Sequence, residues 1–142
     1  MEPKDMWGEV KEDQTIRTPV IVMREQAILL EKKTNGILIG KVKTKLIPFS
    51  KNGQVRFASF DIVAPLLGNY SFRLLELNYD IIKIFPINIF PFQAHEAKEE
   101  CQSIEEFEHA LELILSDQET STVISSLLAQ SRLESKQEAC IF

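Results

Sequence analysis

Two pairs of residues have the types and spacing that could bind a metal. Glu106 and His109 are three positions apart, which places two ligands on adjacent turns of one helix. A dimetal bundle needs a second Glu-x-x-His pair and two further glutamates on other helices, and the chain has neither. We therefore interpret Glu106 and His109, and likewise His95 with Glu99, as surface residues and predict no metal site.

Asp61, Glu76 and Asn78 form a second candidate group, on two consecutive predicted strands. A helix, a strand, a strand with Asp61 and a strand with Glu76 and Asn78 follow an order similar to that of the restriction-endonuclease-like nucleases. In that family Asp and Glu-x-Lys hold a divalent metal beside a basic cleft. The resemblance implies magnesium bound by Asp61 and Glu76, although Asn78 replaces the lysine. A metal-dependent nuclease is therefore an alternative function.

Other catalytic signatures are missing from the sequence. No serine or cysteine lies in a nucleophile-elbow or cysteine-protease motif, which disfavours covalent hydrolysis. The glycines are scattered and form no phosphate-binding loop, which disfavours nucleotide binding. We predict no catalytic residue and no cofactor.

Basic residues are concentrated in one segment of this acidic protein. Between Lys32 and Phe60 there is no acid, and the basic residues are Lys32, Lys33, Lys41, Lys43, Lys45, Lys51 and Arg56. A local excess of one sign creates a field that the net charge of −5 hides. The segment is where an acidic or polyanionic partner would dock.

The predicted hairpin of the first two strands sets the face on which these cations lie. A turn of residues 52–53 or 50–53 pairs odd positions of the first strand with even positions of the second. Lys41, Lys43 and Lys45 would then share an exposed face with Arg56 and Phe60. These are the predicted binding residues: Lys41, Lys43, Lys45, Arg56 and Phe60.

Three interpretations of this basic face remain open. It could bind an acidic protein or the acidic helices of another copy. It could bind a nucleic-acid strand by charge and by stacking on Phe60, although no RNA-recognition motif is present and the sequence pI is 5.1. Alternatively, lysines on a solvated strand keep the sheet soluble and guard its edges.

Length and composition indicate one globular domain. The chain has 142 residues, 44% of them hydrophobic and 26% charged. No apolar run approaches the roughly 20 residues needed to cross a bilayer, and the charged stretch 1–13 lacks a secretory signal. With two cysteines, which we expect to be reduced, the cytoplasm is the expected location and no membrane partner is predicted.

Charge divides the chain into two parts. Residues 1–92 hold 13 basic and 10 acidic groups, whereas residues 93–142 hold 3 basic and 11 acidic groups. This division suggests either neutralisation where the two parts pack, or head-to-tail association between copies.

The first element is predicted as a helix over 19–34. Thr18 is a suitable N-cap, Pro19 suits the first helical position, and Asn35 with Gly36 favours a helix end. The competing prediction is a strand over 20–33 that turns at Asn35 and Gly36, since that pair is also a hairpin signal. Because alternation fails from Ala27 to Leu30, we favour the helix.

Four antiparallel strands are predicted next, over about 37–90. Alternating segments separated by turns suggest strands at 37–49, 54–65, 70–78 and 81–90. Pro86 and Pro91 favour the sheet edge for the last strand, since proline cannot donate to a ladder.

Two helices are predicted in the C-terminal third. Ser103 with Glu106 forms a capping box, and an apolar stripe follows to Leu115. After a break at 116–122, a second stripe runs to about Ser131. We expect an α+β fold in which this helical hairpin covers one face of a four-stranded meander. The expected organisation is a mobile arm at 1–16, one domain at 17–134 and a flexible tail at 135–142.

These observations favour a non-catalytic, cytoplasmic protein-interaction module that associates with itself through its basic sheet face and its acidic helices. The expected partner is a protein or another copy of this chain.

Overall fold

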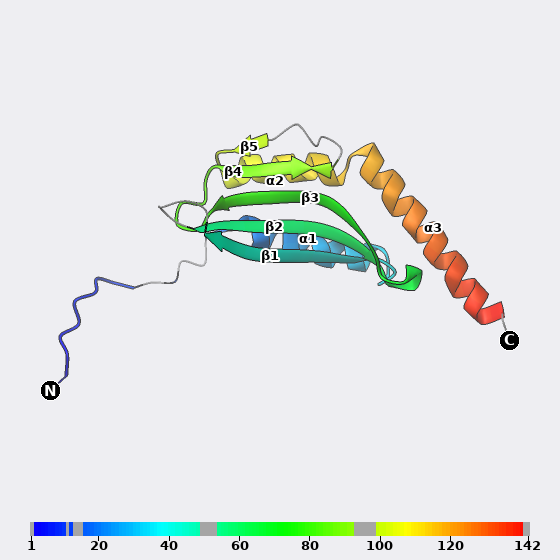
Figure 1. The fold of residues 1–142 in the computed structure, drawn as a ribbon, viewed down its shortest axis with the longest axis horizontal. Coiled ribbons are helices and arrows are strands. Elements are labelled where there is room, and N and C mark those ends of the chain that lie inside the picture. Colours follow the sequence, from blue (N-terminus) through cyan, green and yellow to red (C-terminus); the bar gives the residue numbers. More distant parts are fainter. Residues whose placement is uncertain (1, 11, 13–15, 49–53, 93–98, 141–142) are drawn as a thin grey trace.

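The structure, a computed structural model, describes residues 2–10, 12, 16–48, 54–92 and 99–140, with side chains described up to residue 135. Its elements are α1 (Pro19–Lys33), β1 (Ile39–Pro48), β2 (Gln54–Ala64), the 3-10 helix η1 (Pro65–Leu67), β3 (Tyr70–Asp80), β4 (Ile87–Pro91), β5 (Glu99–Cys101), α2 (Ile104–Leu115) and α3 (Gln118–Cys140). The predicted α+β class is confirmed (Figure 1).

The sheet is an antiparallel meander in the order β1-β2-β3-β4-β5, so β1 and β5 are its two edges. It has five strands, and the prediction of four was wrong because β5 was missed. β5 spans only three residues, Glu99–Cys101, and two of them are glutamates. Its pairing with β4, which places Cys101 opposite Ile87, depends on a long-range contact that local alternation does not reveal.

β4 is shorter than predicted and lies inside the sheet, not at its edge. Residues 81–86 belong to the connection after β3, where the Asp80 carboxylate accepts hydrogen bonds from the backbone N–H groups of Ile82 and Lys83 at 2.8 and 3.0 Å. Pro86 precedes β4 and Pro91 ends it. The prolines therefore remove no donor from the middle of the ladder, and β4 can pair on both sides.

The helix predicted over 19–34 is confirmed as α1, and the strand alternative is wrong. The Thr18 hydroxyl accepts a hydrogen bond from the Ile21 N–H at 3.3 Å, as an N-cap does. At the other end Asn35 and Gly36 take φ values of 53° and 80°, the left-handed region that ends helices. The Thr34 hydroxyl then accepts from the Leu38 N–H at 3.1 Å and connects the helix end to the start of β1.

α2 begins at the predicted capping box. The Ser103 hydroxyl accepts from the Glu106 N–H at 3.1 Å, while the Glu106 carboxylate accepts from the Gln102 N–H. The break before α3 is shorter than predicted, because the Thr120 hydroxyl donates to the Ile114 carbonyl at 2.8 Å and draws the two helices together.

α3 runs past η1 and away from the sheet, so it does not lie flat on the sheet as the predicted hairpin would (Figure 1). Its backbone is helical to Cys140, into the stretch 135–142 that was expected to be a tail. No helix in the described part of the chain combines the length and the apolar character that crossing a membrane requires.

α1 and α2 cover one face of the sheet, α1 behind β1 and β2 and α2 behind β4 and β5 (Figure 1). The core between helices and sheet is built mainly from Met23, Leu38, Phe60, Ile62, Leu75, Leu77, Ile87, Ile89, Phe107 and Leu111. α1 sits close to β1 because Gly40 has no side chain, and a Cβ added there would lie 2.6 Å from the Ala27 Cα. We call the opposite side of the sheet the open face.

Candidate functional site

The open face carries the three lysines of β1. In the observed register Lys41 lies opposite Asp61, Lys43 opposite Ser59 and Lys45 opposite Phe57. Directly opposed residues share a face, so Lys41, Lys43 and Lys45 lie with odd-numbered residues of β2. All three lysines are exposed, and we call them the lysine row.

Arg56 and Phe60 do not join the lysine row, and their predicted placement was wrong. Arg56 lies opposite Leu46, and Phe60 lies opposite Val42 on the helix-covered face, where it is 1% exposed. Residues 49–53, an odd number, separate the paired ends of the two strands, whereas the prediction assumed a turn with an even number. A change of one residue in this number moves every side chain of one strand to the other face.

A cluster of charges lies beside the lysine row, around a buried carboxylate. The Asp61 side chain is 2% exposed; its Oδ1 accepts from the Arg73 Nε at 2.9 Å, and the Lys43 Nζ is 3.6 Å from its Oδ2. The Arg73 Nη1 also donates to the Glu76 Oε1 at 2.8 Å. Hydrogen bonding to Asp61 and then to Glu76 raises the pKa of Arg73 above its ordinary value. These pairs tie β1, β2 and β3 together on the open face.

A β-bulge in β3 makes this cluster possible. Phe60 pairs with Leu75, but Asp61 pairs with Arg73, so Leu74 is an extra residue. Arg73 and Glu76 are three positions apart, which in a regular strand would place them on opposite faces, but the bulge brings them to the same face. Both Leu74 and Leu75 turn toward the core.

This geometry argues against the magnesium site that the nuclease resemblance implies. The guanidinium of Arg73 lies between Asp61 and Glu76 and supplies the positive charge that both carboxylates need. The Asn78 side chain accepts a hydrogen bond from Asn88 instead, at 3.0 Å. Within the described ranges, no three His, Cys, Asp or Glu side chains gather closely enough to hold a metal ion.

The Glu106 and His109 pair is also accounted for by local structure. Glu106 is occupied in capping α2, while His109 lines a groove between the helices. Cys101 is buried, and burial followed by the charges of Glu99 and Glu106 raises its pKa to about 11, which keeps the thiol neutral. His95 and the side chain of Cys140 lie outside the described part of the structure.

A groove between α1 and α2 lies on the helix-covered face and has a volume of about 640 Å³. Phe60, Ile62 and Leu74 form its floor. Its walls come from Val22, Gln26, Leu29, Leu30 and Lys33 of α1, from Glu108, His109, Leu111, Glu112 and Leu115 of α2, and from Ser116, Thr120 and Ile124 at its far end. The result is an apolar trough with polar rims.

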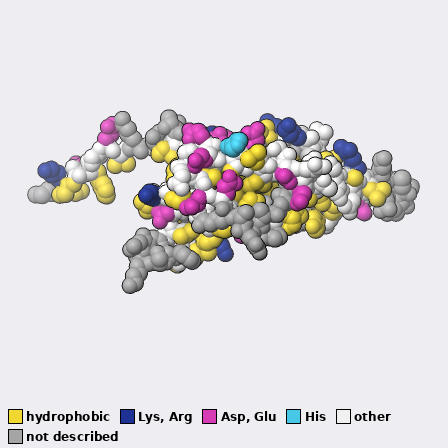
Figure 2. Space-filling model, turned by 90° about the horizontal axis from the view of Figure 1, so that it is seen from above, with side chains coloured by type: hydrophobic (Ala, Val, Ile, Leu, Met, Phe, Trp, Pro, Cys, Tyr) yellow, Lys and Arg dark blue, Asp and Glu magenta, His cyan; other side chains and the backbone are white. Residues whose placement is uncertain are grey.

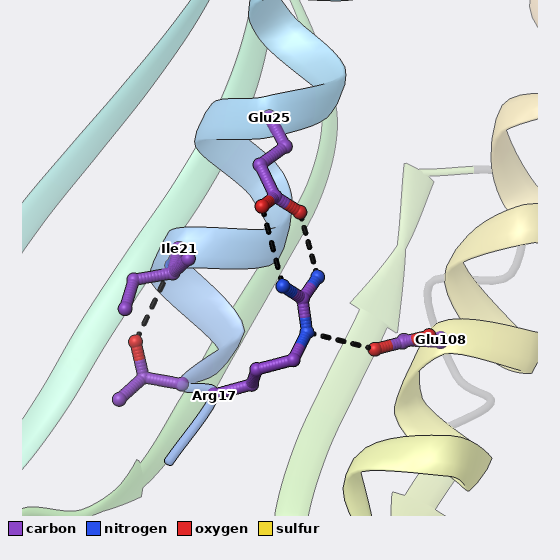
Figure 3. A network of polar contacts seen from close by, with 5 residues as sticks. Arg17, Ile21, Glu25 and Glu108 are labelled. Atoms are coloured by element: carbon purple, nitrogen blue, oxygen red, sulfur yellow. Dashed lines mark hydrogen bonds and ion pairs between the residues drawn. The ribbon is translucent and has the colours of Figure 1, made fainter. Parts of the chain in front are cut away.

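Arg17 joins the two helices beside this groove (Figure 3). Its guanidinium donates two hydrogen bonds to the Glu25 carboxylate, at 2.6 and 3.2 Å, and its Nε donates to the Glu108 Oε1 at 3.3 Å. The hydrogen bonds from Arg17 lower the pKa of Glu25, and those to Glu25 and Glu108 raise the pKa of Arg17. The contact positions the chain ahead of α1. It adds little stability, because all three side chains are solvated.

The sequence of α1 contains one signal for this groove. Beyond the residues that face the sheet, α1 carries Val22, Leu29 and Leu30, which repeat at helical spacing on a second side. A helix that is apolar on two sides must cover two surfaces.

Comparison with models of protein families, with curated proteins and with solved structures finds no match to this chain.

Proposed function

We propose that this protein is a non-catalytic interaction module that associates with copies of itself, head to tail, through the oppositely charged margins of its sheet. The observation that carries the proposal is the position of the charges. The lysine row lies on β1, at one edge of the sheet. At the other edge four exposed acids, Glu99, Glu100, Glu105 and Glu106, lie on β5 and on the first turn of α2, and we call them the acidic margin.

The two margins do not neutralise each other inside one molecule. Three strands separate β1 from β5, and among the described residues no ion pair joins a lysine of β1 to an acid of the C-terminal third. No lysine or arginine occurs from Glu99 to Ser131, so the field of the acids is uninterrupted. Figure 2 looks onto the side of β4, β5 and α2 and shows acidic side chains spread across it.

Charge also selects which edges can meet. Two β1 edges would bring lysines against lysines, and two β5 edges would bring glutamates against glutamates, so both symmetric contacts are repulsive. A β1 edge against a β5 edge places the lysine row beside Glu100, which, like the lysines, lies on the open face opposite Asn88. Such a contact uses the β1 edge of one copy and the β5 edge of the other. The pair still has one free β1 edge and one free β5 edge, so further copies can add to build rings or filaments.

The alternative functions have less support. Nucleic-acid binding relied on Arg56 and Phe60 beside the lysines, and both lie on the opposite face. A nuclease relied on Asp61 and Glu76 as metal ligands, and Arg73 binds both.

A charge-swap experiment tests the proposal. Lys45→Glu and Glu100→Lys each reverse one exposed charge that makes no ion pair within the described structure. Sedimentation is measured at low ionic strength, where the Debye length is about 30 Å, and at high ionic strength, where it is about 3 Å. The parent protein should associate only at low ionic strength, and each variant should associate at least about tenfold more weakly.

An equal mixture of the two variants should associate again, because the glutamate introduced at position 45 of one variant would meet the lysine introduced at position 100 of the other. The pair of opposite sign is then restored with its charges exchanged. Lys32→Glu on α1, outside both margins, is the matched control and should behave like the parent protein. A parent protein that stays monomeric at low ionic strength, or a mixture that stays monomeric, contradicts the proposal.

A further inference from the structure

We infer that the groove between α1 and α2 is a docking site for a short amphipathic helix of a partner protein, with apolar residues on one side and lysines or arginines on the other. This site is separate from the two charged margins and goes beyond self-association.

The dimensions of the groove fit a helix of about three turns. The α1 residues along it run from Val22 to Lys33, which corresponds to a length of about 16 Å at 1.5 Å per residue. α1 and α2 touch each other and already bury the floor of the groove, so the occupant would lie over the groove and pack its apolar side against both helices.

The inner surface of the groove is apolar. Phe60, Ile62 and Leu74 are nearly inaccessible at the bottom, whereas Leu29 on the α1 wall is 42% exposed. An occupant that covers Leu29 would remove apolar surface from water at about 25 cal/mol per Å². Apolar side chains at positions i, i+3, i+4 and i+7 of a helix form the stripe that enters such grooves.

The charge of the rim determines the second property of the occupant. On the α2 side the rim carries Glu108 and Glu112, and Arg17 binds only Glu108. Glu112 makes no ion pair with any residue that the structure describes. Lys33 stands on the α1 side, so a basic side chain of the occupant would be directed toward α2.

The binding of designed peptides tests this inference. The probe is a fluorescent peptide of about 12 residues with leucines at i, i+3, i+4 and i+7 and lysines on the remaining face. Fluorescence anisotropy at moderate ionic strength should show saturable binding. A peptide with glutamates in place of the lysines, and a scrambled peptide of the same composition as the probe, should each bind at least about tenfold more weakly.

Neighbouring exposed residues provide matched variants. Leu29→Glu and Glu112→Lys alter the groove and should each weaken binding of the lysine peptide at least about tenfold. Ile28→Glu changes a residue next to Leu29 that is 56% exposed but lies outside the groove, and it should bind like the parent protein. All three positions are exposed, so the variants should fold normally, which circular dichroism verifies.

Several results would overturn the inference. They are equal binding of the scrambled peptide, equal effects of Leu29→Glu and Ile28→Glu, or no binding of the lysine peptide by the parent protein. Lys45→Glu separates this site from the proposed function, since it should weaken self-association at least about tenfold and leave peptide binding unchanged.

Discussion

Replacing Gly40 by alanine tests whether close packing of α1 on β1 holds the helix layer in place. The added Cβ would lie 2.6 Å from the Ala27 Cα, 2.7 Å from the Ala27 Cβ and 3.2 Å from the Phe60 Cζ. Carbon atoms in contact prefer about 3.5–4.0 Å, so α1 would have to move by roughly 1 Å. Overpacking costs about 1–3 kcal/mol, and we expect a loss of about 3 kcal/mol because the nearest atom belongs to the backbone.

Urea unfolding followed by circular dichroism measures this loss. Gly8→Ala is the matched control, because nothing lies within 4 Å of a Cβ at Gly8, and its stability should stay within about 0.5 kcal/mol of the parent protein. The double variant with Ala27→Gly is more specific. It removes the contact at 2.7 Å but keeps the one at 2.6 Å, and a glycine inside α1 costs about 1 kcal/mol, so stability should not return.

Two outcomes would refute this reasoning. One is a Gly40→Ala protein as stable as Gly8→Ala. The other is a double variant as stable as the parent protein, which would show that the side chain of Ala27, not its backbone, limits the approach of α1.

The remaining predictions concern the buried charge and the buried thiol. Arg73→Met removes the nearest donor to the buried Asp61 carboxylate and should cost about 1–3 kcal/mol in urea unfolding, while Glu76→Gln, at an exposed position, should cost less than about 0.5 kcal/mol; equal losses would contradict this view of the cluster. In a Cys140→Ser background, Cys101 should react with a thiol reagent at pH 8 roughly a hundredfold more slowly in the folded protein than in urea, because its pKa is raised to about 11 from an ordinary value near 9. The folded state then holds the proton more tightly, so stability should fall as the pH rises from about 9 toward 11 in the parent protein, and less in Cys101→Ala; fast labelling of the folded protein would contradict this prediction.

The sequence predicted those elements whose signals are local. Thr18, Pro19 and Gly36 mark the ends of α1, and Ser103 with Glu106 marks the start of α2, since capping requires only neighbours in the chain. β5 could not be found in this way, because a strand of three residues forms only where β4 offers an edge.

The faces on which the strand side chains lie were predicted less well, because they depend on the exact number of residues in each turn and bulge. The prediction assumed an even number of residues between β1 and β2, and one residue more moved Arg56 and Phe60 to the other face. The adjacent leucines at 74 and 75 interrupt alternation in β3 and are a local signal of the bulge. The second apolar side of α1 was a signal that this helix covers two surfaces, but the shape of the groove could not be predicted, since it depends on how α1 and α2 settle on the sheet.

The bulge in β3 also determines where the length of this sheet is free to vary. Because Leu74 is unpaired, a chain without that residue would keep Phe60 opposite Leu75 and Asp61 opposite Arg73, and would lose only one buried side chain from the groove floor. Removal of a residue elsewhere in the paired part of β2 or β3 would move a run of core side chains to the solvent-exposed face. Loss of one leucine of the pair 74–75 in the course of evolution is thus expected to be tolerated, and loss of a residue elsewhere in the paired parts of β2 and β3 to be selected against.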